Sequence, residues 1–94
     1  MTKVPTAQVP RSFLKLLFDE LEIWAKIKNG HLSSKCNDPV ASHGWADGSS
    51  YIIRHYKPNG KHVATSHCVK DKTGEVVHWD AKDLMVNDVR LFVL

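Results

Sequence analysis

The chain has few cysteines and no long uncharged apolar run, and each shortage excludes a class of protein. Its two cysteines, Cys36 and Cys68, are too few for a small scaffold held together by disulfides. The longest apolar segment, residues 13–27, is interrupted by charged side chains, which are Lys15, Asp19, Glu20, Glu22 and Lys26. Those charges exclude a secretory signal core and a membrane-spanning helix. We therefore expect no membrane association, and we predict a cytoplasmic protein with free thiols.

Internal repeats and low-complexity tracts are also missing, and the remaining composition is that of a globular protein. Hydrophobic residues make up 43% of the 94 residues and charged residues 24%, which is unlike a disordered chain. This length fits one domain with a modest core. We predict a single domain over residues 1–94.

Acidic residues are absent from one stretch of the chain. Residues 51–70 contain four Lys or Arg and three His but no Asp or Glu, whereas residues 71–94 contain five acidic residues. The net charge of +3 is weak by itself, so its distribution is more informative. The basic stretch fits either ordinary solvated strand charge or attraction to an anion such as nucleic acid.

The strongest local pattern is helical and predicts one amphipathic helix over residues 11–29, ended by Asn29-Gly30. The apolar residues that recur at helical spacing are Leu14, Leu17, Leu21, Trp24 and Ala25. A second apolar set widens the arc beyond that of a one-sided helix, and its members are Phe13, Leu16, Ile23 and Ile27. Either the segment that follows the helix or a second subunit is expected to cover these additional apolar residues.

Turn-forming residues dominate residues 31–50, and two prolines occur in residues 1–10. We predict an extended lead-in over 1–10 and a long loop over 31–50, with Trp45 holding the loop to the body. The loop also contains His31, Cys36 and His43, but their spacing matches no structural zinc pattern. No metal site and no cofactor are therefore predicted.

From residue 51 onward the hydrophobic period changes to two, which is typical of strands. The predicted strands are 51–56, 62–69, 76–79 and 89–94. Asn59-Gly60 is a strong hairpin turn, and residues 81–88 fit either one helical turn or a short strand. The expected fold is α+β, with one N-terminal amphipathic helix packed on one face of a three- to five-stranded antiparallel meander over 51–94.

The turns also predict a register, and the register separates the two sheet faces. In the first hairpin the expected pairs are Tyr56–Val63, Arg54–Thr65 and Ile52–His67. In the second they are Val69–Val76, Cys68–Val77 and His67–His78. The face that receives the helix should hold Tyr51, Ile53, Ala64, Ser66, Cys68, Val77 and Trp79. The opposite face should hold Ile52, Arg54, Tyr56, Thr65, His67, Val69, His78 and Asp80.

This second face is basic and rich in His and Arg, and it predicts a binding or regulatory domain that engages an anionic partner, RNA first. The residues assigned to substrate binding are Tyr56, Lys57, Lys61, His62 and Thr65. An alternative is a metal-independent ribonuclease of the toxin type, in which His67 and His78 act as acid and base. Arg54 would then stabilise the developing charge, and Asp80 would fix the tautomer of His78.

A third alternative is a protein inhibitor or interaction module. The wide apolar helix face and the terminal strand "VRLFVL" both look able to pair with another surface. On this basis the expected partner is a second copy of the chain, giving a homodimer, or another protein.

Overall fold

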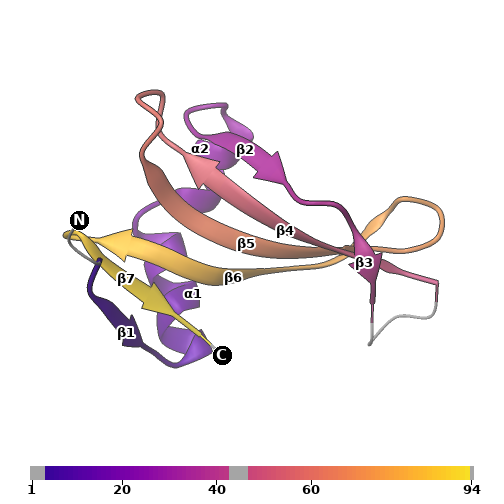
Figure 1. The fold of residues 1–94 in the computed structure, drawn as a ribbon, viewed down its shortest axis with the longest axis horizontal. Helices are drawn as coiled ribbons and strands as arrows, with labels where there is room; N and C mark the ends of the chain where they lie inside the picture. The colour runs from indigo at the N-terminus through magenta and orange to yellow at the C-terminus, as the bar shows by residue number, and fades with distance from the viewer. Residues whose placement is uncertain (1–3, 43–46, 94) are drawn as a thin grey trace.

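In the computed structural model, which describes residues 4–42 and 47–93, two helices lie behind one seven-stranded sheet (Figure 1). The helices are α1 (Arg11–Glu20) and α2 (Ile23–Lys28). The strands are β1 (Thr6–Gln8), β2 (Ser33–Cys36), β3 (Val40–Ala41), β4 (Ser49–Tyr56), β5 (His62–Lys70), β6 (Val76–Val86) and β7 (Val89–Phe92). The α+β class is confirmed, whereas the single helix and the three to five strands were wrong.

The centre of the sheet is the expected antiparallel meander, and extra strands extend both of its edges. The order is β1-β7-β6-β5-β4-β2, with β3 also paired to β4. β1 runs parallel to β7, and β2 and β3 run antiparallel to β4. The extended lead-in predicted over 1–10 contains β1, and the long loop predicted over 31–50 contains β2 and β3. Short edge strands need only backbone hydrogen bonds, so the exposed "SSKC" of β2 pairs without any apolar alternation.

Part of the predicted loop lies outside the described residues. Trp45, which was expected to hold the loop to the body, and His43 both fall there. The described remainder is tied to β4 by Asn37, whose side-chain oxygen accepts a hydrogen bond from the Ile52 N–H at 2.9 Å.

The predicted continuous helix is broken at Leu21 and Glu22. Glu22 adopts a left-handed conformation with φ of 54°, and α2 then begins in a new direction. The break changes which side chains reach the core: Phe18 and Ile23 are buried, whereas Leu21, expected in the core, is 43% exposed. The predicted stop at Asn29-Gly30 is confirmed, since Gly30 has φ of 77°.

The core lies between the helices and the sheet. Its buried hydrophobic members are Leu14, Phe18, Ile23, Leu32, Ala64, Ala81 and Leu84. The small side chains of Ala64 and Ala81 let the helices approach the sheet closely. Trp24 extends the core sideways, because its ring lies 5.0 Å from that of Phe18 and 5.3 Å from that of Trp79. Trp79 itself is 39% exposed, although it was expected on the core face.

A chain of polar side chains crosses the same buried layer. His55 is fully buried, and its ring nitrogens lie 2.8 Å from the hydroxyl oxygens of Ser34 and Ser66. Trp79 donates its indole N–H to Ser66 at 2.8 Å. Burial, with a smaller contribution from His62, lowers the pKa of His55 from 6.5 to about 4, so the imidazole is neutral at pH 7.

Residues 81–88 form a strand and a tight turn, which agrees with the second of the two predicted alternatives. β6 continues to Val86, and Asn87 and Asp88 then adopt φ of 50° and 64° to begin β7. Two consecutive residues with positive φ are the signature of a two-residue hairpin turn. No helix in the described part of the chain is long and apolar enough to cross a membrane.

Candidate functional site on the open sheet face

The sheet face opposite the helices holds most of the predicted site residues, and the first hairpin positions them nearly as expected. Arg54 pairs with Thr65 and Ile52 pairs with His67, as predicted. Tyr56 pairs with His62 instead of Val63, because a β-bulge lies between His55 and Tyr56.

The second hairpin differs from the prediction by two residues. His67 pairs with Asp80, and Val69 pairs with His78. One cause is the turn, where the Asp71 carboxylate accepts hydrogen bonds from the Thr73 and Glu75 N–H groups and closes a longer loop. A bulge beside Val69 adds to the shift. Because side chains alternate with a period of two, a shift of two residues leaves every side chain on its predicted face.

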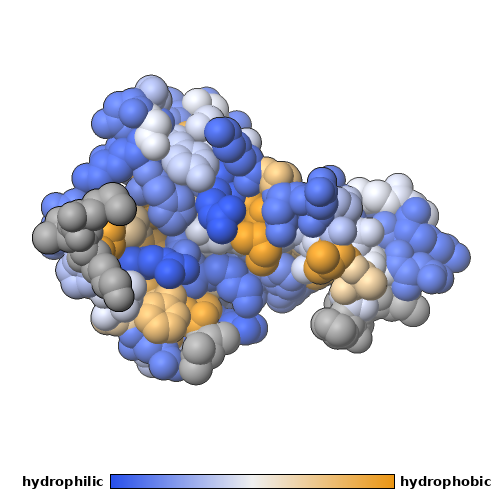
Figure 2. Space-filling view, viewed as in Figure 1, coloured by the Kyte–Doolittle hydropathy of each residue, from blue (hydrophilic) through white to orange (hydrophobic). Residues whose placement is uncertain are grey.

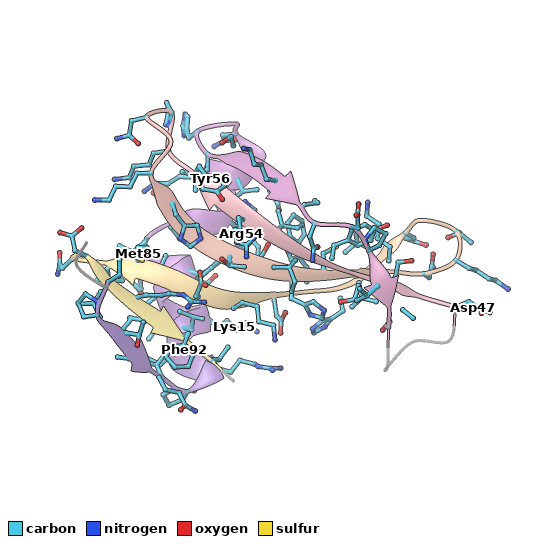
Figure 3. All side chains as sticks on the ribbon, in the orientation of Figure 1. Lys15, Asp47, Arg54, Tyr56, Met85 and Phe92 are labelled. Atoms are coloured by element: carbon cyan, nitrogen blue, oxygen red, sulfur yellow. The ribbon has the colours of Figure 1, made fainter. Side chains whose placement is uncertain are left out.

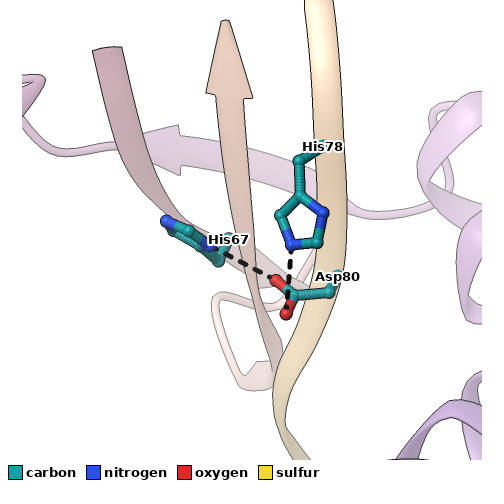
Figure 4. A group of neighbouring side chains, drawn as sticks. All are labelled: His67, His78 and Asp80. Carbon is teal, nitrogen blue, oxygen red and sulfur yellow. Dashed lines mark ion pairs between the residues drawn. The ribbon is translucent and has the colours of Figure 1, made fainter. Parts of the chain in front are cut away.

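His67, His78 and Asp80 therefore still meet on this face (Figure 4). His67 Nδ1 lies 3.4 Å from Asp80 Oδ1, and His78 Nε2 lies 3.4 Å from Asp80 Oδ2. The two imidazole centroids are 5.9 Å apart. We call these three residues the histidine cluster.

Two further side chains support the histidine cluster. Ser50 is hydrogen-bonded to His67 through Oγ and Nε2, on the side of the ring away from Asp80. Arg11 Nη1 lies 3.6 Å from Asp80 Oδ2. The Asp80 side chain is only 16% exposed, and its Oδ1 is buried without a hydrogen-bond partner among residues 4–42 and 47–93. The carboxylate is thus held in place but incompletely satisfied.

Arg54 does not belong to this cluster. It lines a neighbouring cavity of about 480 Å³ that spans β4 to β7 on the same face. We call this the basic cavity, and its residues are Ile52, Arg54, His62, Thr65, Lys82, Asp83, Arg90, Phe92 and Val93. Figure 3 shows Arg54 on β4 and Phe92 on β7, which β5 and β6 separate. The predicted catalytic trio is therefore divided between two sites.

The basic cavity contains an ion pair between the half-exposed Arg90 and the buried Asp83. Arg90 donates two hydrogen bonds, of 2.7 and 3.0 Å, to Asp83 Oδ2, and the Asp83 side chain is 3% exposed. His62 Nε2 lies 3.0 Å from the Thr65 hydroxyl and 3.8 Å from Asp83 Oδ1. Because Arg90 already balances the carboxylate, Arg54 and Lys82 leave the cavity with a surplus of positive charge.

The other predicted binding residues lie at the tip of the first hairpin. Lys57, Lys61 and His62 line a smaller hollow of about 210 Å³. Lys61 is paired with Asp88 at 3.1 Å, and both side chains are exposed. The Tyr56 ring lies 5.6 Å from the ring of His62. His62 therefore connects the hairpin tip to the basic cavity.

Several residues of these sites were missed from the sequence. Lys82, Arg90 and Phe92 belong to the basic cavity, and Ser50 and Arg11 support the histidine cluster. The alternation of Arg90 and Phe92 was a usable signal. Combined with Asn87-Asp88 as a hairpin turn, it would have placed both side chains beside Asp83. Figure 2 shows that this face is mainly hydrophilic, with separate hydrophobic patches near β7, at the middle of the sheet and near β3.

No protein-family model matches the chain, and comparisons with curated proteins and with solved structures find no significant match.

Proposed function

We propose that this protein is a small cytosolic domain that binds single-stranded RNA through the basic cavity. The observation that carries the proposal is the surplus of positive charge around a cavity of about 480 Å³, whose buried carboxylate is already paired with Arg90. A cavity of this kind attracts phosphate without requiring any particular base.

The lining provides both kinds of contact that single strands use. Arg54 and Lys82 offer charged donors to phosphate oxygens, and Thr65 offers a hydroxyl. Phe92 provides a ring for base stacking, and the Arg90 guanidinium lies 5.9 Å from that ring. Aromatic stacking next to cationic side chains is the common mode of recognition for unpaired nucleotides.

The test is the affinity for a short fluorescent single-stranded RNA, measured by anisotropy over a range of salt concentrations. Arg54→Ala and Lys82→Ala should each weaken binding at every RNA sequence and lower the salt slope by about one. Lys28→Ala is the matched control, because Lys28 is an exposed cation on α2, behind the sheet. Wild-type affinity in the Arg54→Ala, Lys82→Ala double variant would contradict the proposal.

The histidine cluster favours a second candidate, which is metal-independent cleavage of the bound RNA. Two imidazoles 5.9 Å apart on one face could act as base and acid, with Asp80 orienting both rings. Arg54 lies in the adjoining cavity and would act on the phosphate from there. Cleavage of RNA in the presence of EDTA, abolished by His67→Ala or by His78→Ala, is the expected result for this candidate.

A third candidate is association through the outer side of α1. Phe13 and Leu16 lie one helical turn apart and are 44% and 53% exposed, and Leu21 is 43% exposed. Exposed large apolar side chains that gather in this way are typical of protein interfaces. We propose a second copy of the chain as the partner.

A further inference from the structure

The histidine cluster has the donor set and the geometry of a metal site. One ring nitrogen from each histidine and one carboxylate oxygen all lie within 4.8 Å of one another. We propose that His67, His78 and Asp80 bind a divalent first-row transition-metal ion, with Zn²⁺ as the expected occupant. This inference is independent of RNA binding, because the histidine cluster and the basic cavity share no residue.

The two contacts to Asp80 are too long for good hydrogen bonds and suit ligands that flank an ion. Both nitrogen–oxygen distances are 3.4 Å, whereas such hydrogen bonds are usually about 2.7–3.2 Å. In a tetrahedral zinc site with bonds of about 2.0–2.1 Å, neighbouring ligand atoms are about 3.3 Å apart. The two contacts end on different Asp80 oxygens, and the three ligand atoms lie within 4.8 Å of one another, so the side chains need only rotate toward a common point for an ion to bind.

Ser50 supplies the outer contact that metal-binding histidines usually have. With Nε2–H of His67 donating to Ser50 Oγ, the lone pair of Nδ1 points toward Asp80. A lone pair then faces the buried Asp80 Oδ1, which has no hydrogen-bond partner within the described part of the chain. In this tautomer both electron-rich atoms would stabilise a cation placed between them.

The donors also select the class of ion. Two imidazoles and one carboxylate favour zinc and its first-row neighbours over Mg²⁺ and Ca²⁺, which prefer oxygen ligands. The His78 side chain is 44% exposed, so water can complete the coordination. Arg11 and Lys15 line a cavity beside His78 and Asp80, and their positive charges oppose a bound cation. Removing the Arg11 charge should therefore tighten metal binding.

A bound metal ion and metal-independent cleavage use the same lone pairs, so one excludes the other. A base in the cleavage reaction needs a free imidazole nitrogen, and coordination occupies that nitrogen on both rings. Cleavage that persists in saturating Zn²⁺ would contradict the metal site.

The test is titration of the untagged full chain with Zn²⁺ by calorimetry and with Co²⁺ by visible absorption. We expect one ion per chain and a Co²⁺ spectrum of tetrahedral intensity. His67→Ala, His78→Ala and Asp80→Asn should each weaken Zn²⁺ binding at least about tenfold, and Ser50→Ala by roughly tenfold. Arg11→Ala should strengthen binding several-fold, a change that a purely structural role for these residues would not produce.

The matched controls are other potential ligands outside the cluster. His62→Ala removes a half-buried histidine of the same sheet face, and Cys36→Ser removes an exposed thiol. Both variants should bind Zn²⁺ as the wild type does. Absence of binding at roughly 1 mM free Zn²⁺, or equal loss in the controls, would overturn the proposal.

A measurement on the wild-type chain keeps the test valid if a variant fails to fold. Co²⁺ should shift the imidazole proton resonances of His67 and His78 in the NMR spectrum and leave those of His31 in place. Shifts at His31 alone would overturn the proposal. Unchanged RNA affinity in folded His67→Ala would separate this site from the basic cavity.

Discussion

At the scale of the residue, His55 shows how a basic side chain is kept neutral inside the protein. The imidazole is fully buried, and both ring nitrogens are satisfied by serine hydroxyls. A charged ring would lose its hydration in this buried position, and the nearby His62 adds a smaller unfavourable interaction. The fold therefore stabilises the neutral form, which is the cause of the lowered pKa.

This pKa predicts that the protein loses stability on mild acidification. The pKa falls from 6.5 in the unfolded chain to about 4 in the folded one, so the unfolded chain binds the proton first. The contribution of neutral His55 to the free energy of unfolding is complete above pH 6.5. It declines as the pH falls toward 4, by about 3 kcal/mol in all. Urea unfolding at several pH values measures it. His55→Gln should remove most of this slope, and an unchanged slope would assign it to other groups.

Residue-level prediction from the sequence succeeded for the sheet face and for two pairs of the first hairpin, and it failed for the pairs of the second hairpin. The face of His67 and His78 follows from alternation alone, which a shift of two residues does not alter. Their exact partners depend on the Asp71 turn and on a bulge, and neither has a clear signal in the sequence. Arg54 was predicted to lie beside the histidines because it shares their sheet face. The face of a side chain does not specify which cavity on that face the side chain lines.

At the scale of the element, the break between α1 and α2 is the main departure from the sequence pattern. Apolar residues recur at helical spacing across the break, so periodicity alone predicts one helix. Glu22 provides no break signal, because left-handed backbone favours Gly or Asn over Glu. The edge strands β1 and β2 were equally hard to predict from the sequence. They are exposed and held mainly by backbone hydrogen bonds, so they show no apolar alternation.

The strained backbone at Glu22 predicts a stabilising substitution. Glu22→Gly should raise the free energy of unfolding by up to about 1 kcal/mol, because glycine adopts positive φ without a steric penalty. Lys26→Gly in α2 is the control, and there glycine should lower stability by about 1 kcal/mol. Chemical denaturation distinguishes the two signs. Destabilisation by both variants would show that the left-handed turn is not a source of strain.

At the scale of the whole molecule, the helices cover only one face of the sheet and leave three surfaces free for function. The basic cavity and the histidine cluster lie on the open face, and the outer side of α1 is apolar. In the described part of the chain, β7 pairs with β6 only from Asp83 onward, so the first half of β6 also has an open edge. An open edge beside exposed Val76 and Trp79 can receive another strand.

These surfaces predict that the chain forms dimers at high concentration. Light scattering should give a mass above 10.6 kDa at high micromolar protein, because association would remove Phe13 and Leu16 from water. Leu16→Lys should restore the monomer mass, since a lysine in an apolar contact must be desolvated. Ala25→Lys adds the same charge at an exposed position of α2 and should leave the mass of the dimer unchanged. A wild-type chain that stays monomeric at every concentration would contradict dimer formation, and the outer side of α1 would then bind a different partner. Dimerisation of Leu16→Lys would indicate that the chains associate through the open edge of β6.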